Sequence, residues 1–338
     1  MGRKLSIDEH AAVLAWGEGF KAVTSFTVQA PIGASLRREA RSELDLYWNL
    51  ANLSRAGDRR PEMSAAAYRV VFRVRVTLEK GLSSLVREQL AAGRIEVSHL
   101  FDGDFFGCSI KQGVSLRMPL ASCAPTRDCE GACYAHDGMD AGRNPVVKGV
   151  LNGLVAESYE QGGEGERSTV RELLRSHVRA AVRAARAEAL RAGFDRQPRI
   201  RFSHVGEIAA FPQFANELAK LVRDESRGDV VSVIYTRHPN AKLLNPELFV
   251  VLFSLDESSE DRRRFVPPTA WIVRSAFGGH VTDSVDVNFL EHHRFIHIKP
   301  VGTGKICPST APETKVRTCD ACQCDFCFKP KVIPLVPA

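Results

Sequence analysis

Eight of the nine cysteines in the chain stand in two groups whose spacing suits metal binding. The first group consists of Cys123, Cys129 and Cys133, and the second of Cys307, Cys319, Cys322, Cys324 and Cys327. Thiolates are soft ligands that select zinc, copper(I) or iron-sulfur clusters. Disulfides are rare in the cytoplasm, where we expect this chain, so clustered cysteines indicate metal ligands or redox groups. Cys108 stands alone, and we interpret it as a small buried hydrophobic residue.

The two groups differ in the kind of site that they can form. Three thiolates leave one position open on a cubane iron or on a tetrahedral metal, and a reactive metal needs such an open position. In the second group, Cys319-x2-Cys322 and Cys324-x2-Cys327 could join Cys307 in a closed four-ligand site with one thiol left over. A single residue separates these pairs, which favours a compact cluster over a zinc ribbon but leaves both zinc and iron open. One cluster or two, and the choice between Cys324 and Cys327, also stay open.

Short apolar segments precede these polar residues, and we expect them to be strands. The segments are 114–121, 199–204, 230–235, 248–253, 270–274 and 295–299. Helical patterns follow several of them, near 145–157, in the arginine-rich segment that ends at Gly193, and around Phe214 and Leu218. Strands that alternate with helices form parallel sheets, and chemistry gathers at the carboxyl ends of the strands. Six strands are fewer than the eight of a closed barrel, so we predict an α/β protein with an open partial (β/α)6 barrel.

We divide the chain into three predicted segments. Residues 1–105 form an N-terminal α+β extension, residues 106–300 the barrel with the three-cysteine site, and residues 301–338 a C-terminal cysteine-rich segment that binds metal. Within the extension, residues 68–78 alternate apolar and charged side chains, which predicts a half-buried strand, and residues 83–92 predict a helix.

Polar residues after two of the strands are candidates for binding a small cofactor. Gly206 and Glu207 follow the second strand, and Ser254 and Asp256 follow the fourth. Glu207 could accept an amine from a ligand, or it could cap the next helix, where the helix dipole favours an acid. Ser254 and Asp256 are open to the same two interpretations. Arg237, after the third strand, could bind a carboxylate or a phosphate.

Taken together, these features resemble the radical S-adenosylmethionine enzymes: three cysteines after the first strand, Gly206-Glu207 after the second and Ser254-x-Asp256 after the fourth. In that family three cysteines hold a [4Fe-4S] cluster whose open iron binds S-adenosylmethionine. The resemblance implies that Cys123, Cys129 and Cys133 are cluster ligands. It also implies that Gly206 and Glu207 meet the amino group of the cofactor, and that Ser254 and Asp256 meet its ribose. The cysteine spacing here is C-x5-C-x3-C, where the family usually has C-x3-C-x2-C.

The chain resembles the phage and plasmid gene product 88 family more closely than it resembles the radical S-adenosylmethionine enzymes. The similarity lies in the cysteine segment from Cys123 to Ala135, in Gly206-Glu207, in Tyr235-Thr-Arg237, and in Cys307-Pro308 with the paired cysteines after it. It covers roughly residues 113–328. This family implies the fold and the metal, but no reaction.

The leading hypothesis is an iron-sulfur enzyme that uses S-adenosylmethionine for radical or group-transfer chemistry on an unknown substrate, with electrons from a donor protein. One alternative is a metal-stabilised nucleic-acid-binding protein of a mobile element. Its contact surface would be the helix on which Arg171, Arg175 and Arg179 recur every four residues, although no aromatic residue is interleaved with them, so nucleic acid is not favoured. Another alternative is a cluster protein that only transfers electrons or senses oxidation. No apolar run reaches the roughly 18 residues of a membrane span, and we expect a cytoplasmic protein without a membrane partner.

Overall fold

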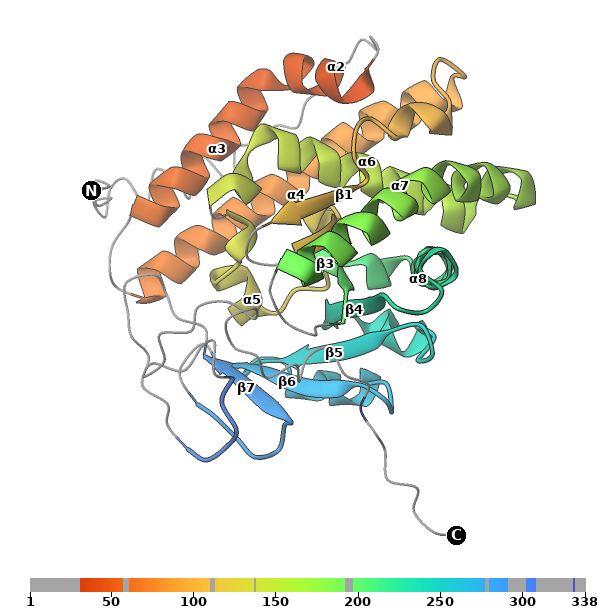
Figure 1. Ribbon diagram of the computed structural model, residues 1–338. Helices are drawn as coiled ribbons and strands as arrows, with labels where there is room; N and C mark the ends of the chain where they lie inside the picture. Colours follow the sequence, from red (N-terminus) through yellow and green to blue (C-terminus); the bar gives the residue numbers. More distant parts are fainter. Residues whose placement is uncertain are drawn as a thin grey trace. The chain divides into compact units, whose positions relative to one another are not determined.

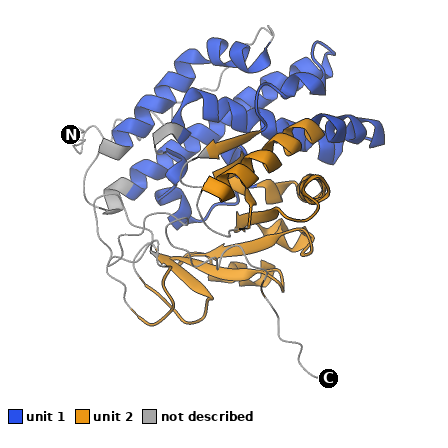
Figure 2. Cartoon of the chain, in the orientation of Figure 1, with its two compact units in different colours: residues 1–105, 117–173, 205–207 blue, residues 106–116, 174–204, 208–338 orange. Residues whose placement is uncertain are grey.

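The structure is a computed structural model of the 338-residue chain, and it describes residues 31–56, 61–109, 113–136, 138–191, 197–276, 280–290 and 302–307, together with Lys331. The chain divides into two compact units (Figure 2). Unit 1 comprises Met1–Phe105, Arg117–Leu173 and Val205–Glu207, and unit 2 comprises Phe106–Leu116, Leu174–His204 and Ile208–Ala338. Both units are therefore assembled from separate stretches of chain.

Unit 1 is built mainly from helices (Figure 1). Its α-helices are α2 (Ile32–Glu39), α3 (Arg41–Ala56), α4 (Pro61–Ala91), α5 (Arg127–Gly131), α6 (Arg143–Gln161) and the first part of α7 (Glu164–Arg191). Short 3-10 helices connect them: η1 (Val97–Leu100), η2 (Leu120–Ser122), η3 (Tyr134–His136) and η4 (Gly138–Ala141). The predicted helix near 145–157 is confirmed as part of α6.

The long helix α4 contains residues 68–78, so the predicted strand there is wrong. The buried side chains of this segment recur every three or four residues, as on one side of a helix: Val71, Phe72, Arg75, Leu78, Glu79 and Leu82. An alternating pattern was inferred because Arg75 was counted as exposed, whereas it is fully buried and pairs with Glu79 one turn later. The described residues between 31 and 105 contain no strand, which corrects the α+β expectation for that part of the chain.

Unit 2 contains a mainly parallel sheet with its seven strands in consecutive order. The strands are β1 (Phe106–Ser109), β2 (Gly113–Arg117), β3 (Arg199–Val205), β4 (Val231–Thr236), β5 (Val250–Leu255), β6 (Trp271–Ala276) and β7 (Val287–Leu290). The pair β1 and β2 is antiparallel, whereas β3 to β7 pair in parallel, each strand with the next. With its helices, this sheet makes the chain an α/β protein.

Most of the predicted strands are confirmed. The segments 199–204, 230–235, 248–253 and 270–274 are β3, β4, β5 and β6, each within two residues at its start and end. The segment 114–121 starts as β2, but the strand ends at Arg117 because η2 begins three residues later. The segment 295–299 lies outside the described residues. The two short strands β1 and β7 were not predicted.

Alternate residues of neighbouring strands form one buried face of the sheet. Its centre consists of Val233, Val250, Leu252 and Val273, with Tyr235, Trp271 and Phe289 packed at its margin. Helix α8 (Pro212–Ser226) buries its predicted apolar side, including Phe214 and Leu218, and contacts β4. After β4 and β5 the connections hold only the 3-10 helices η6 (Pro239–Leu243) and η7 (Glu260–Phe265).

Ion pairs join the second part of α7 to α8 and to the turn after it. Arg179 Nε lies 2.9 Å from Glu225 Oε2, and Arg175 Nη1 lies 3.6 Å from Glu225 Oε1. Arg186 Nη2 lies 2.8 Å from Asp229 Oδ2. Three arginines of the predicted arginine-rich helix therefore have acidic partners within unit 2. Among the described residues, no helix combines the length and the apolar character that a membrane span requires.

Candidate metal centre

The three cysteines of the first group lie in a short irregular segment of unit 1, residues 119–136, which we call the cysteine loop. Cys123 follows η2, Cys129 lies in α5, and Cys133 directly precedes η3. The Thr126 hydroxyl accepts a hydrogen bond of 3.1 Å from the Cys129 N–H and so caps α5. Short helical turns and a capping side chain thus fix the backbone beside each cysteine.

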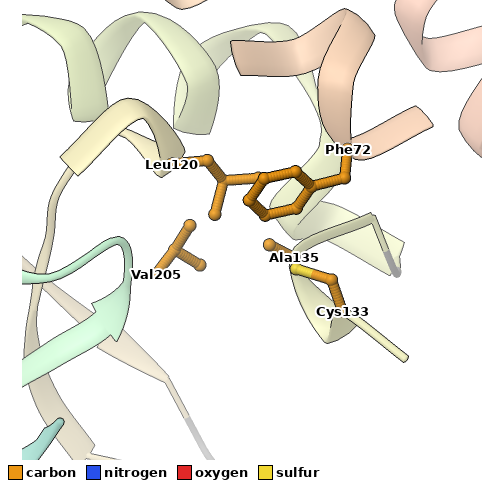
Figure 3. Close-up of a cluster of buried hydrophobic side chains, with 5 residues drawn as sticks. All are labelled: Phe72, Leu120, Cys133, Ala135 and Val205. Carbon is orange, nitrogen blue, oxygen red and sulfur yellow. The ribbon is translucent and has the colours of Figure 1, made fainter. Parts of the chain in front are cut away.

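Cys133 belongs to a small apolar cluster, drawn in Figure 3. The side chains of Leu120 and Val205 face those of Phe72, Ala135 and Cys133, and Cys123 packs against the same cluster. Because these residues come from α4, from both ends of the cysteine loop and from the end of β3, the cluster ties the loop to the rest of unit 1.

The predicted turn Gly206-Glu207 is held against the beginning of the cysteine loop. The Met118 N–H donates to the Val205 carbonyl at 2.7 Å, and the Glu207 N–H donates to the Ser122 hydroxyl at 2.9 Å. Gly206 has a φ of 72°, and a Cβ on it would lie 2.5 Å from the carbonyl oxygens of Met118 and Pro119. Only glycine suits this turn, because a side chain would clash with the backbone and prefer another φ.

Acidic groups surround the thiol of Cys123. Burial raises the pKa of Cys123 well above its ordinary value, and Glu207, Cys129, Cys133 and Glu79 add to the increase. Cys129, Cys133 and the predicted acid Glu207 therefore all lie within electrostatic range of Cys123. Because these groups are negative when ionised, their charges around Cys123 favour a cation there.

A tighter arrangement is absent from the described residues, where no three His, Cys, Asp or Glu side chains are close enough to hold one metal ion. The ligands of a four-iron cluster bind different iron atoms, so they need not converge on one point. The three thiols of the cysteine loop fit such a cluster in number and in chemistry.

A buried ion pair on α4 contacts both ends of the cysteine loop, and sequence reasoning missed it. Arg75 Nε donates to Glu79 Oε1 at 2.8 Å, and both side chains are fully buried. Glu79 Oε2 accepts from the Ala121 N–H at 3.0 Å. Arg75 Nη1 donates to the carbonyls of Ala135 at 2.8 Å and of Asp140 at 3.0 Å. Charged residues are rarely fully buried, so their residue types gave no sign of this pair. The only available signal was the separation of four residues between an arginine and a glutamate, which suits an ion pair on a helix.

His136 is fully buried beside this pair. Its Nδ1 lies 3.1 Å from the Tyr47 hydroxyl, and the rings of Tyr47, Tyr68 and Phe72 contact the imidazole edge to face. Burial lowers the pKa of His136 well below its ordinary value, and the positive charge of Arg75 lowers it further. We therefore expect His136 to be neutral at pH 7.

The other predicted cofactor-binding residues lie in unit 2, where Ser254 and Asp256 both contact Arg237. Arg237 Nη1 donates to Asp256 Oδ2 at 2.5 Å, and its Nη2 donates to Ser254 Oγ at 3.2 Å. Asp256 Oδ1 also accepts from the Ser258 N–H at 3.1 Å and from its hydroxyl at 2.9 Å. Asp256 thus takes part both in a turn and in an ion pair with Arg237. The turn agrees with the interpretation of Asp256 as a local cap.

The second cysteine group is described only at its first member. Cys307 is buried in unit 2, and its N–H donates to the carbonyl of Asn288 on β7 at 2.8 Å. Cys319, Cys322, Cys324 and Cys327 lie outside the described residues. Cys108 is exposed on β1, so its interpretation as a buried residue is wrong.

Comparison of the chain with family models, with curated proteins and with solved structures found no match.

Proposed function

We propose that the chain is an iron-sulfur enzyme that uses S-adenosylmethionine at a [4Fe-4S] cluster held by Cys123, Cys129 and Cys133. The observation that carries the proposal is the attachment of the Gly206-Glu207 turn to the cysteine loop within unit 1. An acid that belongs to a different stretch of chain lies, buried, within electrostatic range of the first cysteine. A ligand with an amino group could therefore bind Glu207 and an open iron position at once.

Each residue has a separate task in this proposal. The three cysteines bind iron, Glu207 accepts hydrogen bonds from the cofactor's amino group, and Gly206 lets the turn approach the loop. Ser254 and Asp256 are assigned to the ribose on the resemblance alone, with Arg237 orienting both side chains. When bound, the cluster supplies an electron to S-adenosylmethionine for radical chemistry, or the cofactor takes part in group transfer.

The finer fold belongs to the same proposal. We propose that β2 to β7 form the open partial (β/α)6 barrel. The consecutive strand order and the parallel pairs from β3 to β7 support it. Such a barrel would exclude water from a reactive species. The expected partners are S-adenosylmethionine, an unknown substrate and an electron-donor protein.

The proposal predicts that the spectrum of the reconstituted protein changes when S-adenosylmethionine is added. We expect Glu207→Ala to weaken this response without loss of iron, because Glu207 would bind the ligand rather than the metal. Cys133→Ala should abolish both the iron signal and the response. Glu157→Ala, an acid of unit 1 outside the cysteine loop, is the matched control and should behave like the unchanged protein. Anaerobic reconstitution followed by absorption and electron paramagnetic resonance spectra measures all four.

Two results would contradict the proposal. A colourless anaerobic protein that contains only zinc would exclude both the enzyme and a cluster that merely transfers electrons. An iron-sulfur protein whose spectrum ignores S-adenosylmethionine in its oxidised and reduced forms would exclude the enzyme and favour the electron-transfer or redox-sensing alternative.

A further inference from the structure

We infer that Arg75 and Glu79 are positioning residues that hold the cysteine loop in its ligand-presenting conformation before any metal binds. The inference rests on the proposed metal at Cys123, Cys129 and Cys133, but not on the identity of that metal. We call this pair the Arg75–Glu79 clamp, because its two members contact opposite ends of the same loop.

Glu79 holds the first end of the loop. Its Oε2 accepts a hydrogen bond from the Ala121 N–H, two residues before Cys123. Leu120, the residue before Ala121, packs in the same apolar cluster as Cys133. Because Glu79 lies on the rigid helix α4 and is locked by Arg75 Nε, the path of the backbone into Cys123 is fixed.

Arg75 holds the other end. Its Nη1 donates to the carbonyl of Ala135, two residues after Cys133, and to the carbonyl of Asp140 in η4. The Tyr47 hydroxyl lies 3.1 Å from the same nitrogen, whose two N–H groups are shared among the three acceptors, and this contact connects the clamp to α3. One planar guanidinium thus fixes three separate segments of unit 1 around the last cysteine.

Stability alone gives a weak reason for such a pair. A buried ion pair loses much of its attraction to desolvation, and well-packed apolar residues in its place often leave a protein equally stable. In the described structure, Arg75 Nη2 is buried without a hydrogen-bond partner, which is a further penalty. What apolar residues could not supply is the set of hydrogen bonds to the loop backbone, and these orient the segment that carries the thiols.

The experiment compares two double variants, each of which removes an ion pair of α4. Arg75→Met with Glu79→Leu removes the clamp and keeps the site apolar. The matched control is Arg87→Met with Glu157→Leu, which removes a bidentate pair that joins α4 to α6 away from the loop. For the metal-free full-length protein, hydrogen exchange reports the Ala121 and His136 amides. Titration with Co²⁺ measures metal binding through the thiolate absorption band. The part of this band that Cys129→Ala removes is the part that belongs to the cysteine loop.

We expect the clamp variant to fold and its Ala121 amide to exchange about tenfold faster or more. It should bind Co²⁺ at the loop about 10 to 100 times more weakly, with a weaker thiolate absorption band. The control should match the unchanged protein in all three respects. If the clamp variant folds and keeps both the amide protection and the Co²⁺ affinity, the inference is wrong.

A single variant keeps the test decisive if the double variant does not fold. Arg75→Lys retains the charge opposite Glu79, but its single nitrogen cannot replace both Nε at Glu79 and Nη1 at the two carbonyls. We expect it to keep the Ala121 amide protected, to speed exchange at His136, whose N–H donates to the Cys133 carbonyl, and to weaken Co²⁺ binding. Unchanged exchange and unchanged Co²⁺ affinity in this variant would overturn the inference. Failure of the S-adenosylmethionine response with weakened Co²⁺ binding would instead overturn only the proposed enzyme.

Discussion

Individual buried charges in unit 1 are accommodated in two different ways. Arg75 forms an ion pair with Glu79 and donates hydrogen bonds to backbone carbonyls. Lys148, on α6, has no such acid within hydrogen-bonding distance among the described residues, and its ammonium donates to the carbonyl of Asp102 at 3.1 Å. Burial lowers the pKa of Lys148 to about 8, although Asp102 and Asp104 oppose the decrease. A charge without a close counter-ion therefore becomes easier to neutralise.

This difference predicts how stability depends on pH. The unfolded chain should bind the Lys148 proton up to a pKa near 10.5, whereas the folded chain releases it near 8, so stability rises with pH between these values. Relative to Lys148→Met, the unchanged protein should gain up to about 3 kcal/mol of unfolding free energy across this window, and less to the extent that water reaches the ammonium. Denaturant unfolding of both proteins at several pH values measures the difference, in which other titrating groups cancel. A constant difference from pH 7.5 to 10.5 would contradict the assignment.

Some residues of the candidate site could be predicted from their types and spacing, and others could not. Cysteine spacing and the position of Gly206-Glu207 after a strand selected residues that lie within electrostatic range of Cys123, although no three such side chains among the described residues are close enough to hold one metal ion. Arg75 and Glu79 were not selected, because a charge in a sequence is normally read as exposed, and nothing in their residue types reveals that a loop backbone far along the chain will satisfy them.

Helices α7 and α8 show that regularly spaced arginines can form ion pairs within the protein instead of binding an outside ligand. Glu225 accepts both Arg175 and Arg179, and the Arg179 hydrogen bond lowers the pKa of Glu225 below its ordinary value. These arginines have acidic partners within unit 2, which weakens the case for a phosphate-binding surface.

We therefore expect Arg175→Ala with Arg179→Ala to affect stability slightly and nucleic-acid binding not at all. Loss of exposed ion pairs should lower the unfolding free energy by less than about 1 kcal/mol. Arg183→Ala is the control, since Arg183 is exposed on the same helix and has no ion pair among the described residues. Binding to DNA and RNA is measured as a function of salt. Salt-dependent binding that the double variant loses would restore the nucleic-acid alternative.

Helices and strands were predicted well where burial alone determined the pattern of apolar residues. They were predicted poorly where buried charged residues interrupted that pattern. Strand β5 is buried along its whole length and is apolar except for Ser254, which is close to the pattern of a parallel strand covered on both faces. Residues 68–78 of helix α4 were predicted as a strand because charged residues, including the buried Arg75, broke the apolar pattern. Strands β1 and β7 are four residues each, too short for an apolar period to stand out.

At the scale of the whole molecule, the first cysteine group and Cys307 belong to different units. Cys123, Cys129 and Cys133 lie in unit 1, and Cys307 lies in unit 2, where β7 holds its backbone. The backbone around Cys307 and that around the first group are thus held by different parts of the chain, and the iron content distinguishes one cluster from two.

If the groups bind separate cubanes, anaerobically reconstituted protein should approach about eight irons per chain, four for each cluster. Cys129→Ala should then remove about half of the iron. Cys108→Ala, an exposed thiol outside both groups, should remove none. Iron and protein analyses measure the ratio. A value near four in the unchanged protein would mean that both groups share one cluster or that only one group is loaded.

The interleaved chain has a consequence for synthesis on the ribosome. Unit 1 needs Val205 for its apolar cluster and Glu207 for the bond to Ser122, yet both emerge more than 70 residues after Cys133. Chains are made at about 5 to 20 residues per second. The nascent cysteine loop therefore waits several seconds without its last packing partner, with its thiols open to oxidation or to stray metal. Delivery of the proper metal is best timed after residue 207 has left the exit tunnel.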